Sequence, residues 1–111
     1  MQKHSIFTFS AIASVAVAAA RFIGIGTGAH CAAGAKALGV TQTPAAAGEA
    51  VAVDVVGTAI VEAGGAILPW VPIKSDAAGK AIAQGGTGEV LGYAITSATA
   101  EGQKIEVLLK F

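Results

Sequence analysis

KIEVLLKF, residues 104–111, is the stretch of sequence that decides the fold of this chain. Its apolar side chains occupy alternate positions, namely Ile105, Val107, Leu109 and Phe111. The positions between them carry the charged residues Lys104, Glu106 and Lys110. Successive side chains of a β-strand point to opposite faces, so this alternation is typical of a strand with one buried face. The stretch therefore predicts a half-buried strand at residues 104–111.

The same period of two recurs along the chain and predicts further strands. These lie at 51–56, 58–62 and 90–96, and Gly57 separates the first two. Turn-forming residues separate the runs, namely AGE at 47–49, AGG at 63–65, SDAAG at 75–79, GGTG at 85–88 and EGQ at 101–103. Short strands with turns at roughly ten-residue spacing predict an all-β, mostly antiparallel small barrel or sandwich. Alanine-rich residues 29–38 and 45–48 leave short helices open as an alternative.

Composition limits the function classes. The chain has 111 residues, which is enough for one domain at 1–111, and its 7 basic and 7 acidic residues give a net charge of zero. Only 13% of residues are charged, against about 25% in a typical soluble domain. The high apolar content excludes a disordered chain, and seven scattered basic residues argue against a basic face for nucleic acid. A single cysteine, Cys31, excludes a disulfide scaffold. Hydrophobic residues make up 54%, which favours burial in a larger assembly.

The first twenty residues allow three interpretations. A secretory signal would have Lys3 in its charged start, an apolar core at 6–17 and a cleavage site at 18–20. A membrane span needs about 20 apolar residues, whereas serine and threonine interrupt this run. The alternation of apolar residues from Phe7 to Val17 favours a strand or an extended arm. We expect residues 1–20 to form such an arm, with Phe7 and Phe9 contacting a neighbouring subunit or a larger surface.

Two short motifs invite a chemical interpretation. GIGTGA at 24–29 imitates the dinucleotide-binding fingerprint, but that site needs a βαβ unit, and the chain beyond residue 40 is predicted as strands and turns. We therefore expect a glycine-rich hairpin turn there. His30 and Cys31 are adjacent, but zinc needs three or four converging ligands and no such spacing exists. No catalytic set, cofactor site or metal site is predicted. Asp76 is expected to cap the turn before Gly79.

Trp70 is the remaining candidate for a functional residue. It lies in the proline-flanked segment LPWVPI at 68–73, which indicates an edge or an extended connection. Its indole could close one end of the barrel, or it could anchor a protein interface, where tryptophan is enriched.

Ordered segments over nearly the whole chain resemble a family of small phage head decoration proteins, also called capsid cement proteins. The segments are AARFIG at 19–24, ALGVT at 37–41, AAGE at 46–49, VDVVGTAIVEAGGAI at 53–67, SDAAGKA at 75–81, LGYA at 91–94, ATAEG at 98–102 and IEVLL at 105–109. Each segment alone is common, and the specificity lies in their order and spacing.

The resemblance implies a single decoration-type β-domain, of β-tulip or jelly-roll-like architecture, with an N-terminal arm. It implies a structural virion protein rather than an enzyme, one that binds the outer surface of a tailed-phage capsid. Homotrimers that contact the major capsid protein and reinforce the shell are expected, with assembly in the host cytoplasm. No cofactor, nucleic acid or membrane partner is implied.

Two other function classes remain as alternatives. One is a secreted or periplasmic β-domain that acts as a binding module after cleavage of residues 1–20. The other is a small nucleotide-binding enzyme that uses residues 24–29, which a helical rather than β spectrum would favour.

Overall fold

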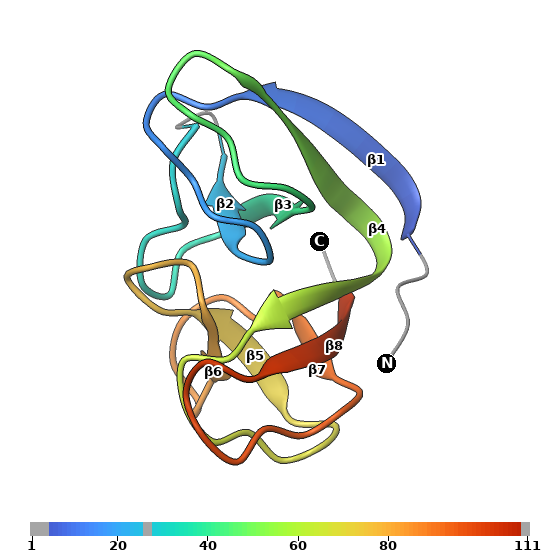
Figure 1. The fold of residues 1–111 in the computed structure, drawn as a ribbon. Helices are drawn as coiled ribbons and strands as arrows, with labels where there is room; N and C mark the ends of the chain where they lie inside the picture. The colour runs from blue at the N-terminus through green and yellow to red at the C-terminus, as the bar shows by residue number, and fades with distance from the viewer. Residues whose placement is uncertain (1–4, 26–27, 110–111) are drawn as a thin grey trace.

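The computed structural model describes residues 5–25 and 28–109, and for residues 5–10 it describes the backbone alone. The described residues form strands and turns without a helix, which confirms the predicted all-β class. The eight strands of Figure 1 are β1 (Ser5–Ile12), β2 (Phe22–Gly24), β3 (Ala37–Thr41), β4 (Ala50–Glu62), β5 (Pro72–Ser75), β6 (Ala81–Ala83), β7 (Gly92–Ala94) and β8 (Lys104–Leu109).

The strands build one antiparallel sheet that curls until it is nearly a closed barrel. Its order is β2-β3-β4-β8-β7-β5-β6, and β1 joins it by pairing with β4. The chain just after β4 closes the ring, because Ala63 forms a bridge with Ala81 and the Gly64 amide donates to the Ala81 carbonyl at 2.7 Å. The 29–38 and 45–48 stretches are not helical, and Ala37–Thr41 is strand β3 instead.

Strand β4 is the central strand of the sheet, because it pairs with β1, β3 and β8. The sequence predicted two strands separated by Gly57, but the structure has one 13-residue strand that continues through this residue. Gly57 adopts a φ of +100°, a conformation that glycine reaches at little cost. The first part of β4 pairs with β1 and β3, and the part after Gly57 pairs with β8. Figure 1 shows β4 curving from the upper half of the molecule into the lower half.

The predicted N-terminal strand is present from Ser5 to Ile12. It pairs with β4 of its own chain, from Ser5 opposite Gly57 to Ile12 opposite Ala50, with shifts of register between Ser5 and Thr8. The segment after it also belongs to the fold, because Ala13, Val17 and Ala20 are buried. Residues 5–20 are thus part of the sheet and its core. Contact of this segment with another subunit remains a prediction.

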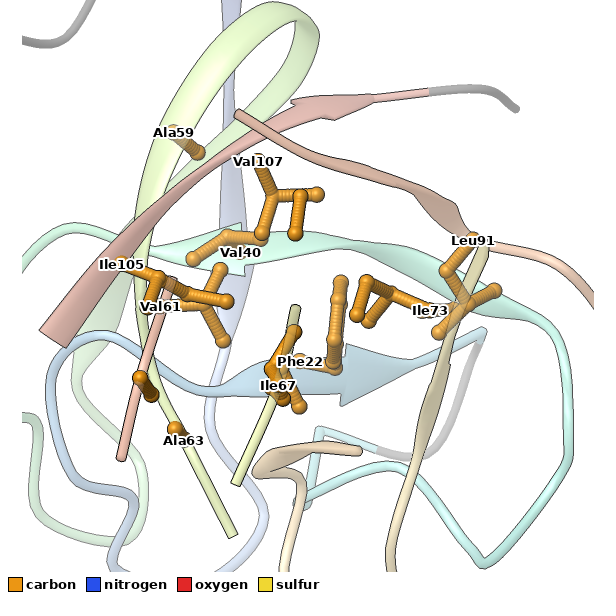
Figure 2. Packing of buried hydrophobic residues seen from close by; sticks show 14 of the residues in the cluster. Phe22, Val40, Ala59, Val61, Ala63, Ile67, Ile73, Leu91, Ile105 and Val107 are labelled. Carbon is orange, nitrogen blue, oxygen red and sulfur yellow. The ribbon is translucent and has the colours of Figure 1, made fainter. Parts of the chain in front are cut away.

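Two clusters of buried side chains hold the barrel together. Adjacent residues of β2 point into different clusters: Phe22 into the larger one and Ile23 into the smaller one. Figure 2 shows Phe22 in the middle of the larger cluster, with aliphatic side chains of β3, β4, β5 and β8 around it. Ala13, Val17, Ala45, Val51 and Val53 complete the buried part of the smaller cluster. The β2–β3 ribbon therefore lies between the two clusters and contributes side chains to both.

The predicted alternation is confirmed in β8 and differs in β7. Ile105 and Val107 are fully buried and Leu109 packs against the same cluster, as the sequence predicted. Glu106 on the other face is also buried, at 8% exposure, and Lys110 and Phe111 of the predicted strand lie outside the described residues. Within β7 the buried residues are Gly92 and Ala94, whereas Tyr93 is half-buried, and Leu91 just before the strand is also buried. The period of two holds within this three-residue strand, but the face with Gly92 and Ala94 is the buried one, whereas the sequence pattern favoured the face with Tyr93.

Candidate partner interface

The segment from Ile67 to Val71 is the most prominent apolar projection among the described residues. Its first residue pairs with Ala98 through two backbone hydrogen bonds of 2.8 and 2.9 Å. At its other end the Trp70 amide donates to the Ala94 carbonyl, and the Ala94 amide donates to the Val71 carbonyl at 3.1 Å. The loop is therefore fixed to the 94–98 region at both ends, which leaves its tip a defined shape.

Leu68, Pro69 and Trp70 form the tip of this loop, and we refer to them as the Trp70 knuckle. Leu68 is 73% exposed and Trp70 is 63% exposed. The indole therefore does not close the end of the barrel, and that alternative from the sequence is wrong. Trp70 has a φ of +64°, a left-handed conformation that costs an ordinary residue about 1–2 kcal/mol. A bulky aromatic residue is thus held in a strained conformation and directed into solvent.

A second group of exposed apolar side chains lies at the other end of the molecule. Ile12 is the last residue of β1, Val15 follows that strand and Ile25 follows β2, and each is more than half exposed. The Ser14 amide donates to the Gly28 carbonyl at 2.9 Å, so the segment after β1 lies against the turn after β2. Figure 1 shows this region at the top, whereas the chain between β4 and β5 that carries the Trp70 knuckle lies at the bottom.

Strand β1 contributes a backbone edge. Within residues 5–25 and 28–109, β4 is the strand that pairs with it, and its other edge has no described pairing partner. The strand reads SIFTFSAI, without the charge or proline that natural edge strands commonly carry to prevent further pairing. Phe7 and Phe9 are positioned opposite Val56 and Val53 of β4. Their side chains lie outside the part of the chain that the structure describes.

The glycine-rich motif is a hairpin turn, as predicted. Ile23 bridges to His30, and the Gly24 amide donates to the Ala29 carbonyl at 2.9 Å. The motif thus connects β2 to an antiparallel bridge at His30, not to a helix, and its described residues provide no helix N-terminus for a pyrophosphate. Residues 26–27 of the motif lie outside the described part.

His30 and Cys31 have separate structural roles. Cys31 is fully buried, burial raises the pKa of its thiol, and the Sγ lies 3.4 Å from the Ala35 carbonyl. His30 accepts a hydrogen bond from the backbone, at Nε2. Among the described residues, no three His, Cys, Asp or Glu side chains are grouped so that they could hold a metal ion.

A network of charged residues ties the barrel's turns together. Glu62 at the end of β4 lies 3.3 Å from Arg21 and 3.6 Å from Lys80, and Lys80 lies 2.9 Å from Glu101. Hydrogen bonding to Glu101, together with the charges of Glu101 and Glu62, raises the pKa of Lys80. Asp76 caps its turn as predicted, because Oδ1 accepts from the amides of Ala78 and Lys80 at 2.8 and 2.9 Å. These contacts join neighbouring turns and so have a structural role.

The sequence therefore identified part of the candidate interface. It singled out Trp70, but it did not indicate the exposure of Leu68 beside it or the strained backbone. It missed the apolar group at the opposite end, because Ile12, Val15 and Ile25 resemble ordinary core residues by type alone. Over the described residues, no helix has the length and apolar character needed to cross a membrane.

Comparisons with known proteins give this geometry a context. A solved structure described as the head fiber gp8.5 N base of bacteriophage phi29 matches with a TM-score of 0.76. The match covers 94% of this chain and 93% of that chain at 23% sequence identity, so it establishes a shared fold. No curated protein sequence shows significant similarity to the chain. The family model described as phage cement protein matches residues 1–109, and the chain therefore belongs to the phage cement protein family.

Proposed function

We propose that this phage capsid structural protein binds the outer surface of a tailed-phage head as a homotrimer and stabilises the shell. Membership of the cement family supports a role on the capsid. The major capsid protein is then the natural partner. A small subunit gains from contacting its siblings and the shell at once, because linked contacts raise the effective concentration of each one.

The observation that carries the proposal is the Trp70 knuckle. A fixed loop that presents Leu68 and Trp70 to solvent has no use for them in an isolated barrel, since the core is closed without them. Tryptophan is enriched among the residues that dominate binding energy at protein interfaces, where losing one commonly costs about 2 kcal/mol or more. We therefore assign the Trp70 knuckle to a contact with the shell.

The open edge of β1 is our second proposed contact. An extended segment of a neighbouring chain can pair with such an edge through backbone hydrogen bonds, and side chains such as Phe7 and Phe9 then provide specificity. The uncharged sequence of β1 does not oppose this pairing. The two contacts lie on different parts of the barrel, so one subunit can touch two partners.

We further propose that the protein has no catalytic activity and binds no cofactor, nucleic acid or membrane. It would act in the virion, on the outside of the capsid, after assembly in the host cytoplasm. The alternative of a secreted binding module requires cleavage near residue 20. That cleavage would remove β1 and the buried residues Ala13, Val17 and Ala20, so the remaining chain would lose part of its sheet and core.

The direct test is to mix the purified protein with undecorated capsids of its own phage and to determine the particle structure by electron cryomicroscopy. We expect density for three subunits around three-fold positions on the outer surface. Isolated monomers, density inside the shell, or no binding at saturating concentration would each contradict the proposal.

The β1 contact is tested with Phe7→Ala and Phe9→Ala in a co-sedimentation assay with the same capsids. We expect weaker binding than for Glu89→Gln, a control that changes an exposed charge on a turn remote in sequence from β1. The melting temperature of each free variant is measured first. If Phe7→Ala and Phe9→Ala melt like the wild type and bind like the control, the β1 assignment is wrong.

A further inference from the structure

His30 makes a hydrogen bond that only its neutral form can make. Its Nε2 lies 3.0 Å from the backbone nitrogen of Ala18. A backbone amide can only donate, so Nε2 must be the acceptor and the ring proton must be on Nδ1. Protonation of the ring would place a second N–H in front of the Ala18 amide, and the bond would be lost.

This bond holds the chain where its backbone is under strain. Ala20 has a φ of +58°, which is unfavourable for alanine. The Thr41 hydroxyl donates to the Ala18 carbonyl at 2.7 Å, and Thr41 Oγ1 accepts from the Arg21 amide at 3.1 Å. His30 thus holds the N–H of Ala18 and Thr41 holds its C=O. Without the His30 contact, the Ala18 amide loses its described partner and the strained turn is held less firmly.

The groups around His30 mostly disfavour a positive charge on it. Burial is the main factor that lowers the pKa of His30 below its ordinary value of 6.5, and the charge of Arg21 lowers it further. Asp76 acts in the opposite direction. Lys36 lines the same surface hollow as His30 and adds a second cation there. The ring is only partly buried, so a proton from solvent can reach it.

We propose that His30 is an acid-sensitive clasp that holds the segment 13–20 against the barrel at neutral pH and releases it on protonation. The segment connects β1 to β2 and places Ala13 and Val17 in the smaller core cluster. Loosening it therefore weakens the attachment of β1 to the rest of the fold. The clasp is a property of the isolated chain and does not depend on capsid binding.

The direction of the pH effect follows from the lowered pKa. Below pH 6.5 the unfolded chain takes up a proton on His30 before the folded chain does. The contribution of His30 to stability is therefore complete above pH 6.5 and is lost as the pH falls through the folded-state value. Loss of one hydrogen bond of ordinary strength gives roughly a tenfold increase in local opening.

The test is an NMR titration of the wild-type protein from pH 8 to pH 4.5. We expect the His30 ring to titrate below 6.5, the Ala18 amide resonance to shift with the same midpoint, and its hydrogen exchange to rise roughly tenfold beyond the intrinsic pH effect. An Ala18 resonance that does not follow His30, or a His30 midpoint at or above 6.5, would overturn the proposal.

His30→Gln provides an independent test, because the amide oxygen of glutamine can accept the Ala18 hydrogen bond and glutamine does not titrate. His4→Gln is the matched control, since His4 is the other histidine of the chain. We expect the urea midpoint of His30→Gln to fall less between pH 7.5 and pH 5 than the midpoints of the wild type and His4→Gln. Equal losses in all three proteins would show that His30 is not the clasp.

Discussion

Replacing Trp70 by glycine and by alanine separates backbone strain from binding. With Trp70 63% exposed, about a third of the side chain is covered. A fully enclosed tryptophan buries about 200 Å², so the covered part is about 70 Å² and contributes about 2 kcal/mol. Both substitutions lose most of this contribution. Glycine alone relieves the strain at φ +64°, which is worth about 1–2 kcal/mol.

The gain from glycine is partly offset in the unfolded chain. Glycine makes that chain more flexible, which costs about 0.4–1 kcal/mol relative to alanine. We therefore expect Trp70→Gly to be more stable than Trp70→Ala by up to about 1.6 kcal/mol, or several degrees in melting temperature. Differential scanning calorimetry of the free proteins measures this difference.

Capsid binding should respond differently from stability. If the indole contacts the shell, both variants lose about 2 kcal/mol or more of binding free energy, which is about a thirtyfold weaker Kd. Co-sedimentation with undecorated capsids measures this loss, with Glu89→Gln as the control. Wild-type binding by both variants would refute the interface assignment. Greater stability of the alanine variant would refute the strain argument.

Two further predictions concern the barrel itself. Gly39→Ala should destabilise the protein by about 1–3 kcal/mol in urea unfolding, because a Cβ there would lie 2.6 Å from Val53 Cγ1 and against the Asp54 carbonyl. Gly65→Ala is the control and should be tolerated, because a Cβ at that position meets nothing within 4 Å. Equal stability of these two variants would contradict the close approach of β3 and β4. The raised pKa of Lys80 means that its stabilising contribution is complete below pH 10.5 and is lost at higher pH, so Lys80→Met should reduce the alkaline sensitivity of the melting temperature. An unchanged alkaline profile in Lys80→Met would show that the Glu62–Lys80–Glu101 contacts add nothing.

Strands with a clear alternation could be predicted from the sequence. Which of their faces is buried could be predicted only where charged residues mark the other face. The pattern at β8 gave the correct buried face because charged residues separate the apolar ones. At β7 glycine and alanine lie between larger residues, and Ala94 faces the core because Gly92 lets the strand approach Leu108 of β8 closely. Close approach between backbones leaves little room for large side chains, and periodicity alone does not reveal it.

The pairing of β1 illustrates a second limit. Period two predicted an extended segment near the N-terminus, but it gives no information about which strand an extended segment pairs with. The structure pairs β1 with the first part of β4, whose residues are 38 to 52 positions further along the chain. Long-range partners depend on the curvature of β4 around Gly57, and neither strand encodes that curvature in its hydrophobic pattern.

Ala20 and Trp70 are the two described non-glycine residues with a positive φ, and they differ in how the fold holds them. Ala20 is buried, and its conformation is fixed by contacts from Thr41 and by the Glu62 amide, which donates to its carbonyl at 2.8 Å. Its strain is thus offset by the packing of the segment it belongs to. Trp70 has no comparable enclosure, because most of its side chain faces solvent. Strained residues persist where the surrounding structure or a function requires them. The backbone strain of about 1–2 kcal/mol offsets most of the roughly 2 kcal/mol that the covered part of the indole contributes, so the fold gains little net stability from a tryptophan here. Binding is the explanation that accounts for both its side chain and its backbone.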